Sequence, residues 1–524
     1  MKLIACAALA ALPLGAATCE GLGSAKLANT RITAAQTVAA GAFPAPAGGQ
    51  PGLPAPDFKS LPAFCRVQGV IEPTADSHIE FEVWLPVAGW NGKYRGLGNG
   101  GFAGAIDFGG LANSLAYGYA VSATDTGHKG GATDAAWALG HPEKVADFGY
   151  RAIHETADKA KELAKAYYSN APRRSYFSSC SNGGREALME AQRYPADYDG
   201  ILAGAPANYW THLLTGAGAD LQALNEPGAY IPATKLPAIQ AATLAACDAR
   251  DGVKDGVIDD PSRCQFDPGQ LLCKDAESDA CLTAPQLTAL KKLYAGARDA
   301  SGKQIFPGRV VGGETGPNAW ADWITGREPN RSLMFAFGTQ FFGNMVYENA
   351  SWDYHTFQAD RAVKTADDKL ARTLNSTDPD LKRFRDRGGR LIMYHGWSDA
   401  AISPLNSIDY FQAVEAKMGA KETDGFVRLY LAPGMTHCAG GPGPDSFGQA
   451  SVSAADPQHS ATKALERWVE DGTAPEAIVA TKYKAGPKGE VIRTRPLCPY
   501  PQVARYKGSG NTDDAANFTC VKSN

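Results

Sequence analysis

The chain has 524 residues, of which 44% are hydrophobic and 20% are charged, and its formal net charge is −4. This composition is ordinary for a globular protein, and the length predicts two or more domains or one domain with a large insertion. The charge gives no electrostatic footprint for nucleic acid. The sequence after the N-terminus has neither a basic run nor a long apolar segment, so it does not predict a membrane partner.

The first 17 residues, MKLIACAALAALPLGAA, combine one lysine, a short apolar run and small residues at the end. These features in this order are typical of a secretory signal peptide, here cleaved after Ala17. We therefore expect residues 1–17 to be removed and the mature protein to be secreted or periplasmic.

The number of cysteines indicates that the protein works in an oxidising compartment. Cys6 lies in the predicted signal peptide, which leaves ten of the 11 cysteines in the mature chain. An even number in an exported chain predicts disulfides; the alternative, a zinc site or free buried thiols, lacks paired C-x-x-C spacing. Pairing of sequence neighbours, followed by elimination, predicts five bridges: Cys247–Cys264, Cys273–Cys281, Cys498–Cys520, Cys19–Cys65 and Cys180–Cys438.

Strand patterns alternate with helical spacing in the first part of the mature chain. Such alternation is typical of an α/β domain with a largely parallel sheet. We expect strands at 78–85, 93–98, 119–123, 175–177 and 201–204, and helices at 147–166 and 184–194.

The alternating pattern breaks after Pro206 and returns with predicted strands at 390–394 and 426–431. The block between them mixes helices, loops, acidic clusters and aromatic residues. We therefore expect an α/β core in two parts, residues 18–206 and 382–524, interrupted by an inserted domain at 207–381.

Ser181 lies between a predicted strand and a predicted helix, in the window SCSNGG at 179–184. A nucleophilic serine on such a sharp turn needs small neighbours so that its hydroxyl projects above the sheet. Gly183 fits this pattern, whereas Ser179 stands where the usual motif has glycine. The alternative is a serine that caps a helix in a glycine turn.

A serine nucleophile needs a base, and the base needs an orienting carboxylate. Asp399 and His437 each follow a predicted strand, on the side where open α/β sheets place their chemistry. The order Ser181, Asp399, His437 is that of the α/β-hydrolases, although each residue alone could be an ordinary cap or loop residue. If Cys180 and Cys438 are bonded, the Cα atoms of Ser181 and His437 lie within roughly 13 Å of each other.

Backbone N–H groups are expected to form an oxyanion hole for this serine. One would come from Asn182, directly after the nucleophile. The other would come from Gly100 or Gly101 after an early strand, where glycine lets the backbone approach a substrate closely. An ordinary tight turn is the alternative for the glycines.

A loop at 247–260, CDARDGVKDGVIDD, has closely spaced carboxylates and two glycines. Like charges so close together repel unless a cation neutralises them, and calcium takes six to eight hard oxygen ligands. The loop lacks the D-x-D-x-D-G pattern of an EF-hand, and a solvated acidic turn is the alternative. We expect structural calcium on the side chains of Asp248, Asp251 and Asp255 and the carbonyls of Val253 and Val257.

These residues resemble the tannase and feruloyl esterase family, which also contains an esterase that cleaves a terephthalate half-ester. The similarity covers nearly the whole mature chain. It includes the calcium loop and LGNGGFAG at 97–104, TDTGH at 124–128, DFGYRAIH at 147–154, CSNGGRE at 180–186, DGILAGAPA at 199–207, HGWSD at 395–399 and HC at 437–438.

The resemblance implies an α/β-hydrolase with a large inserted lid that hydrolyses esters of aromatic acids. Feruloyl or hydroxycinnamoyl esters are expected first, with galloyl esters or a terephthalate half-ester as alternatives. Ser181 would form an acyl-enzyme, His437 would move the proton and Asp399 would hold the imidazole. The family's calcium cage falls on the five positions given above. Asn182 departs from the family's usual threonine, alanine or glutamate, so its side chain could alter the acyl pocket.

Aromatic residues of the insertion could stack on an aromatic acid, although most are expected to pack the core of the lid. The candidates are Phe335, Phe337, Phe341, Phe342, Tyr347 and Trp352. A peptidase or lipase on the same scaffold and a non-catalytic binding module are the competing hypotheses. The lid lacks the long apolar helix of a lipase, and a binding module would be expected to lose one of the three catalytic residues.

Overall fold

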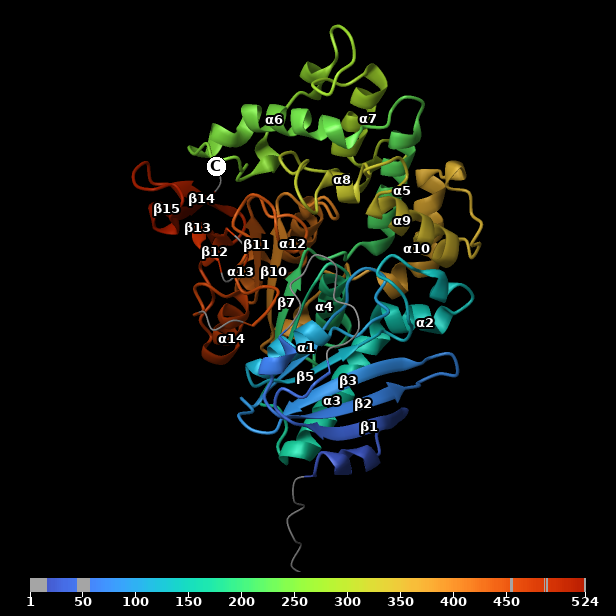
Figure 1. Ribbon diagram of the computed structural model, residues 1–524, viewed down its shortest axis with the longest axis vertical. Coiled ribbons are helices and arrows are strands. Elements are labelled where there is room, and N and C mark those ends of the chain that lie inside the picture. The colour runs from blue at the N-terminus through green and yellow to red at the C-terminus, as the bar shows by residue number, and fades with distance from the viewer. Residues whose placement is uncertain (1–16, 45–56, 453–455, 485, 487–488, 523–524) are drawn as a thin grey trace, which may run out of the picture.

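The computed structural model describes residues 17–44, 57–452, 456–484, 486 and 489–522 (Figure 1). The predicted signal peptide falls on residues 1–17, of which 1–16 lie outside the described residues. Among the described residues, none of the helices has the length and apolar character needed to span a bilayer.

A nine-stranded sheet forms the centre of the molecule, in the order β1-β2-β3-β5-β4-β6-β7-β10-β11. Strands β1, β2, β3 and β5 pair antiparallel, and all pairs from β5 to β11 are parallel. The largely parallel α/β core predicted from the sequence is therefore present. The strands are β1 (Thr30–Val38), β2 (Phe64–Ile71), β3 (Ile79–Pro86), β4 (Lys93–Leu97), β5 (Ala120–Thr124), β6 (Arg174–Cys180), β7 (Gly200–Gly204), β10 (Arg390–Gly396) and β11 (Val427–Ala432).

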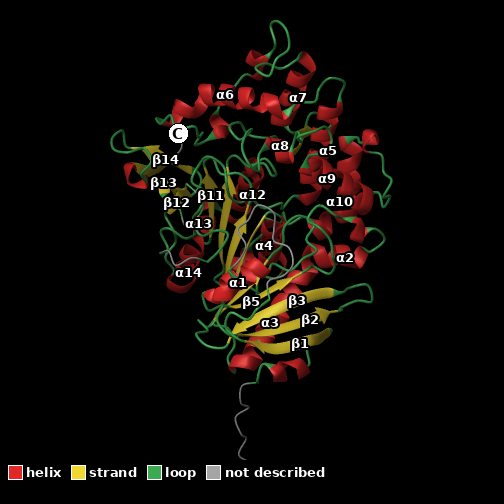
Figure 2. Ribbon diagram, in the orientation of Figure 1, coloured by secondary structure: helices red, strands yellow, loops and turns green. Residues whose placement is uncertain are grey.

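Helices pack on both faces of this sheet (Figure 2), and its parallel strands β5 and β7 are buried along their whole length. Phe177 and Ile201 belong to the cluster of α3, α4 and α12, whereas their neighbours Tyr176 and Leu202 pack with α14 on the opposite face. The core helices are α1 (Phe108–Ala116), α2 (Pro142–Ala146), α3 (Ala152–Tyr168), α4 (Asn182–Arg193), α11 (Lys382–Asp386), α12 (Pro404–Met418), α13 (Ala420–Asp424) and α14 (Ala461–Asp471).

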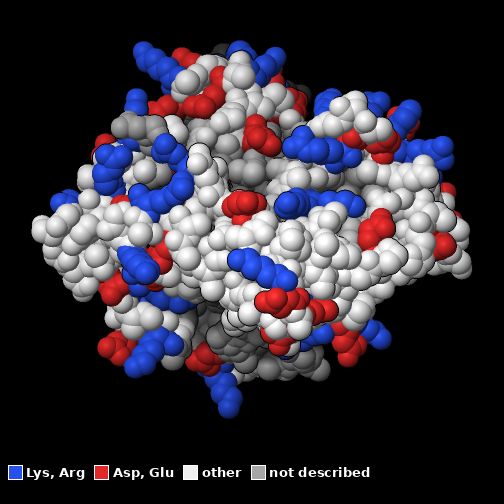
Figure 3. Space-filling model, turned by 90° about the horizontal axis from the view of Figure 1, so that it is seen from above, with Lys and Arg blue, Asp and Glu red and all other residues white. Residues whose placement is uncertain are grey.

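Between β7 and β10 the chain leaves the sheet and forms a mainly helical block above it in Figure 1. Viewed from above in Figure 3, acidic and basic side chains are interspersed among uncharged residues on this side of the molecule. The block contains α5 (Trp210–Asn225), α6 (Leu236–Cys247), α7 (Ala284–Ala295), β8 (Ala297–Arg298), β9 (Gln304–Phe306), α8 (Trp320–Trp323), α9 (Leu333–Gln340) and α10 (Ala359–Leu374).

Some element boundaries differ from the sequence-based expectation. The predicted helix at 147–166 begins with a π-helical turn, Asp147–Arg151, before α3 continues it to Tyr168. Helix α4 begins at Asn182 rather than at Gly184. Four C-terminal strands were not predicted, and the last three of them are partly exposed: β12 (Ile478–Tyr483), β13 (Val491–Leu497), β14 (Gln502–Tyr506) and β15 (Phe518–Lys522).

All five predicted disulfides are confirmed. Their Cα–Cα distances run from 4.9 Å to 6.0 Å, within the range that the bond requires. The bridge between Cys19 and Cys65 joins the N-terminal segment to β2, and the bridge between Cys180 and Cys438 joins the end of β6 to the loop after β11.

Candidate active site

Ser181 occupies a strained turn between β6 and α4. Its backbone has φ 67° and ψ −125°, a conformation that is costly for a residue with a side chain and recurs at functional sites. The turn is held by a hydrogen bond from the Ser181 N–H to the carbonyl of Gly204 at 2.9 Å. A Cβ atom on Gly184 would collide with that same carbonyl, so the close approach of α4 to β7 requires glycine. The sharp strand-to-helix turn predicted from the sequence is therefore present at Ser181.

His437 and Asp399 form a hydrogen-bonded pair at 2.7 Å between Nδ1 and Oδ2. The backbone N–H groups of Ala401 and Ile402 donate to the other carboxylate oxygen, at 2.8 and 2.9 Å. Burial raises the pKa of Asp399, but the facing charge of His437 and the hydrogen bonds from His437 and His395 outweigh it. The pKa of Asp399 therefore lies well below its ordinary value, and a carboxylate is available to orient His437.

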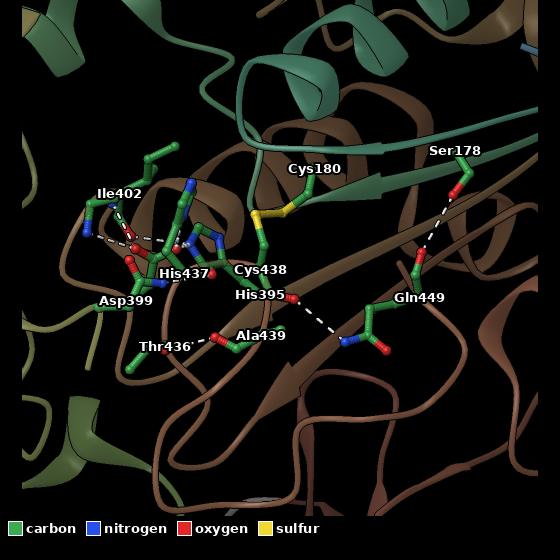
Figure 4. Close-up of a disulfide and its surroundings, with 12 residues drawn as sticks. Ser178, Cys180, His395, Asp399, Ile402, Thr436, His437, Cys438, Ala439 and Gln449 are labelled. Atoms are coloured by element: carbon green, nitrogen blue, oxygen red, sulfur yellow. Dashed lines mark hydrogen bonds and ion pairs between the residues drawn. A yellow bond between two sulfur atoms is a disulfide. The ribbon is translucent and has the colours of Figure 1, made fainter. Parts of the chain in front are cut away.

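A second histidine, His395, also holds Asp399, as Figure 4 shows. Its Nε2 lies 3.0 Å from Asp399 Oδ2 and 3.0 Å from the carbonyl of Ile402. Because that carbonyl can only accept, Nε2 carries the proton, and Nδ1 accepts from the Ser407 hydroxyl at 2.8 Å. His395 belongs to the HGWSD motif, but the sequence analysis assigned no role to it. Its offset of four residues from Asp399 was the available signal.

The disulfide between Cys180 and Cys438 brings the nucleophile turn and the histidine loop together (Figure 4). The two Cα atoms lie 6.0 Å apart, although the cysteines are 258 positions apart in sequence. Ser181 and His437, each adjacent to one of these cysteines, line the same cavity. Gln449 Nε2 donates to the Cys438 carbonyl at 3.4 Å, which links the histidine loop to the segment before α14.

The predicted oxyanion-hole residues border this cavity as well. Among the described residues, no acceptor bonds to the N–H of Gly100 or Gly101. Asn182 is the first residue of α4, where the N–H has no intrahelical acceptor. The Asn182 side chain is buried and tied to Glu186 and Arg185 at 2.9 and 2.7 Å, which leaves its amide little freedom to reshape the acyl pocket.

The cavity has a volume of about 940 Å³, and the inserted block supplies an apolar wall. Of the six lid aromatics considered from the sequence, Phe337 is the one that lines it among the described residues; Phe341 and Phe342 are fully buried in the lid core. Sequence reasoning missed two tryptophans, because they lie on separate helices whose spacing resembles ordinary core packing. The lid residues of this wall are Trp210, Leu213, Leu214, Trp323, Leu333, Met334 and Phe337.

The acidic loop after α6 has the oxygen-rich character that calcium needs. Among the described residues, no donor bonds to the carbonyls of Val253 or Val257. Burial and the neighbouring carboxylates of Asp255 and Asp248 raise the pKa of Asp251 to about 6, which a bound cation would reverse. The Cys247–Cys264 bridge closes the loop. The hard oxygens of this set are of the ligand type that calcium prefers, and they do not favour a soft metal.

Two further features of this loop were not predicted. Asp259 is buried beside the cluster, and burial together with the charges of Asp251 and Asp255 raises its pKa. Arg495 donates to Asp255 at 2.6 Å, so part of the negative charge is already balanced from β13.

Comparison with known proteins shows which family this chain belongs to. The model of the tannase and feruloyl esterase family matches residues 65–521. An uncharacterised esterase of Xanthomonas campestris pv. campestris is 43% identical over 99% of this chain and 94% of its own length. A probable feruloyl esterase B-2 of Aspergillus terreus is 31% identical over 87% of this chain and 86% of its own length.

A solved structure supports the same family. The crystal structure of feruloyl esterase B from Aspergillus oryzae superimposes with a TM-score of 0.87 at 30% identity and covers 96% of this chain and 99% of its own. The fold is that of the α/β hydrolases, and the protein is a carboxylic-ester hydrolase. It belongs to the tannase and feruloyl esterase family, as the sequence motifs predicted.

Proposed function

We propose that this protein is a serine esterase that cleaves esters of aromatic acids, feruloyl and other hydroxycinnamoyl esters first among them. The observation that carries the proposal is the strained Ser181 turn, joined by a disulfide to the His437–Asp399 pair beside an apolar cavity. Relatives named as feruloyl esterases at 30–31% identity support the hydroxycinnamoyl preference.

The proposed reaction proceeds through an acyl-enzyme. Ser181 Oγ attacks the ester carbonyl carbon while His437 Nε2 takes the hydroxyl proton, and Asp399 holds the ring. The N–H groups of Gly100 and Asn182 stabilise the negative oxygen of the tetrahedral intermediate, with Gly101 adjacent. Collapse of this intermediate breaks the ester bond, and His437 gives its proton to the leaving alcohol. Water then attacks the acyl group in the same way and releases the acid.

A substrate panel with a nucleophile variant tests this proposal. We expect methyl ferulate and methyl p-coumarate to be hydrolysed faster than methyl gallate or a terephthalate half-ester. Ser181→Ala should lower kcat by several orders of magnitude, about 10⁶-fold in a comparable triad, with an unchanged melting temperature.

Covalent labelling with a fluorophosphonate separates an esterase from a binding module. Wild-type protein should label at Ser181, and the Ser181→Ala variant should not. A folded wild-type protein that never labels would exclude the serine mechanism, and a preference for peptides or long acyl chains would favour the peptidase or lipase hypothesis.

We also propose that the protein is exported and that its acidic loop holds structural calcium. The residues at 1–17 and the five disulfides support export. Side chains of Asp248, Asp251 and Asp255 and the carbonyls of Val253 and Val257 would hold the ion, which would neutralise the crowded carboxylates and fix the loop.

A further inference from the structure

The cavity at Ser181 has a second, polar wall that the proposed reaction does not use. This wall comes from β4, the segment of α1, β6 and the loop before α14, whereas the apolar wall comes from the lid. The residues of the polar wall are Arg95, Asp107, Asn113, Ser114, Ser178 and Gln449.

Arg95 is the unusual member of this wall. The residue is 2% exposed, and its Nε and Nη1 atoms have no hydrogen-bond partner among the described residues. The hydroxyl of Ser114, on the same wall, is also buried without a partner. An unsatisfied buried donor is costly, and a charged one more so, so each such group in a native protein calls for an explanation.

The neighbouring carboxylates do not provide that explanation. Asp107 and Glu466 are the acidic groups that act on Arg95, but neither lies within 4.0 Å of its guanidinium. Glu466 instead pairs with Lys93 at 3.2 Å and Lys463 at 3.1 Å. Burial lowers the pKa of Arg95 to about 10, which still leaves it charged at neutral pH.

The position of Arg95 indicates which part of an ester would reach it. Arg95 pairs with Tyr176, five residues before Ser181, a separation of about 16 Å along the strand at 3.3 Å per residue, and Arg95 and Ser181 line the same cavity. The aromatic acid fits the apolar lid wall. The polar wall includes Gln449, which contacts Cys438 directly after His437. Trp323 of the apolar wall also contacts the His437 ring, with centroids 5.2 Å apart, so the two walls meet at His437. With the aromatic acid on the apolar wall, the polar wall remains for the alcohol part.

We propose that Arg95 binds a carboxylate on the alcohol part of the ester, so that esters of aromatic acids with hydroxy acids are preferred substrates. This inference rests on the proposed esterase function and adds the chemical class of the leaving group. A guanidinium donates to a carboxylate in a planar, two-point geometry, and such charge-assisted bonds are strong in a buried site. Arg95 is then a specificity residue rather than part of the reaction chemistry.

The first test needs no variant. Caffeoylquinate, its methyl ester at the quinate carboxyl group, and methyl caffeate share one acid part and differ in the charge of the alcohol part. We expect kcat/KM for caffeoylquinate to exceed that for its methyl ester by about tenfold to a hundredfold, from KM more than kcat. Equal values would overturn the inference.

The second test assigns the effect to Arg95. Arg95→Met should abolish the preference for caffeoylquinate over its methyl ester while leaving kcat/KM for methyl caffeate within about twofold. Lys93→Met is the matched control, because Lys93 lies on the same strand and pairs with Glu466 but does not line the cavity. It should keep the preference. An Arg95→Met protein that keeps the preference, or loses activity equally on all three esters, would show a structural role only.

If the Arg95→Met protein does not fold, Arg95→Lys is used instead. Lysine keeps the charge but not the two-point geometry, so it should reduce the preference only in part. A full preference with lysine would overturn the proposed guanidinium contact. Binding of caffeoylquinate to Ser181→Ala, with and without the Arg95 change, gives a readout independent of turnover: affinity should fall about tenfold or more without Arg95, and an unchanged affinity would overturn the inference.

Two other outcomes are distinguishable. If Arg95→Met instead impairs monomethyl terephthalate but not dimethyl terephthalate, the carboxylate belongs to the acid part and the assignment to the alcohol is wrong. If none of the caffeoyl esters is hydrolysed, the proposed hydroxycinnamoyl esterase function fails and this inference fails with it. If methyl caffeate is hydrolysed without discrimination by charge, the esterase function stands and only the Arg95 inference is wrong.

Discussion

Single side chains decide how well the His437 imidazole is oriented. Asp399 is fully buried. One of its carboxylate oxygens accepts from two backbone N–H groups, and the other accepts from two histidines. His395 donates to the same oxygen as His437, so it holds the carboxylate without competing for the proton of the His437 ring. A hydrogen bond of this kind does not touch the substrate; it keeps a residue of the site in the orientation that the site needs.

Replacing His395 tests this positioning role. His395→Leu should lower kcat by about ten- to hundredfold, the effect expected for a hydrogen bond to a charged group, with little change in KM. His395→Gln can place an N–H near the original Nε2 and should recover much of the loss. Equal losses in both variants would instead indicate a packing role, which the melting temperatures of the two proteins would reveal.

Glu186, in helix α4 directly after Ser181, offers a test of a buried ionisable group. Burial raises its pKa to about 7, against opposing contributions from Arg185 and hydrogen bonds from Asn99 and Asn182. A raised native pKa means that the folded protein holds a proton that the unfolded chain releases from about pH 4.5 upward. This contribution to stability is therefore present below pH 4.5 and is lost as pH rises through about 7.

Glu186→Gln should remove that dependence. Between pH 4.5 and 7, wild-type protein should lose up to about 3 kcal/mol relative to the variant, at about 1.4 kcal/mol per pKa unit. Denaturant unfolding across this range measures the difference. Glu422→Gln, which changes an exposed carboxylate, is the control and should parallel wild type; a Glu186→Gln protein that also parallels wild type would contradict the shift.

The Cys180–Cys438 disulfide joins the turn between β6 and α4 to the loop after β11, and so holds two distant elements together at the site. The disulfide could be predicted from the sequence, because each cysteine adjoins a candidate catalytic residue and the mature cysteines pair without remainder. The positions of Ser181, Asp399 and His437 after strands could be predicted, because the strands before them carry recognisable apolar residues. The cavity wall could not, because Trp210 and Trp323 come from different helices and meet only through tertiary packing.

Removal of this bridge should impair catalysis more than folding. Cys180→Ala with Cys438→Ala releases the Ser181 turn from the His437 loop, and a displacement of about 1 Å in such a site can cost about 10²-fold in rate. We expect at least a tenfold loss of kcat/KM in protein that still folds. Cys273→Ala with Cys281→Ala, which opens a bridge in the inserted block with a sequence separation of 8, should leave the rate unchanged. Wild-type turnover without the Cys180–Cys438 bond would refute the tether.

On the scale of the whole molecule, the acidic loop connects the insertion to the C-terminal strands. Arg493 and Arg495 of β13 both contact the carboxylate of Asp255, at 3.2 and 2.6 Å. The loop was predicted from its local sequence, whereas this long-range contact was not, because β13 is partly exposed and gave no clear strand signal. A cation in the loop would thus stabilise the junction of two parts of the chain that are far apart in sequence.

Calcium removal tests this junction directly. A ligand that binds only the folded state adds about 2.7 kcal/mol at a concentration one hundred times its dissociation constant, so strong chelation should lower the melting temperature by several degrees. Added Ca²⁺ should restore it and added Mg²⁺ should not, because magnesium prefers a smaller octahedral site. Asp251→Asn should lower the melting temperature and the response to chelation together, whereas Asp275→Asn, at an exposed position of the inserted block, should change neither. A wild-type melting temperature that chelation leaves unchanged would exclude the calcium site while leaving the esterase proposal intact.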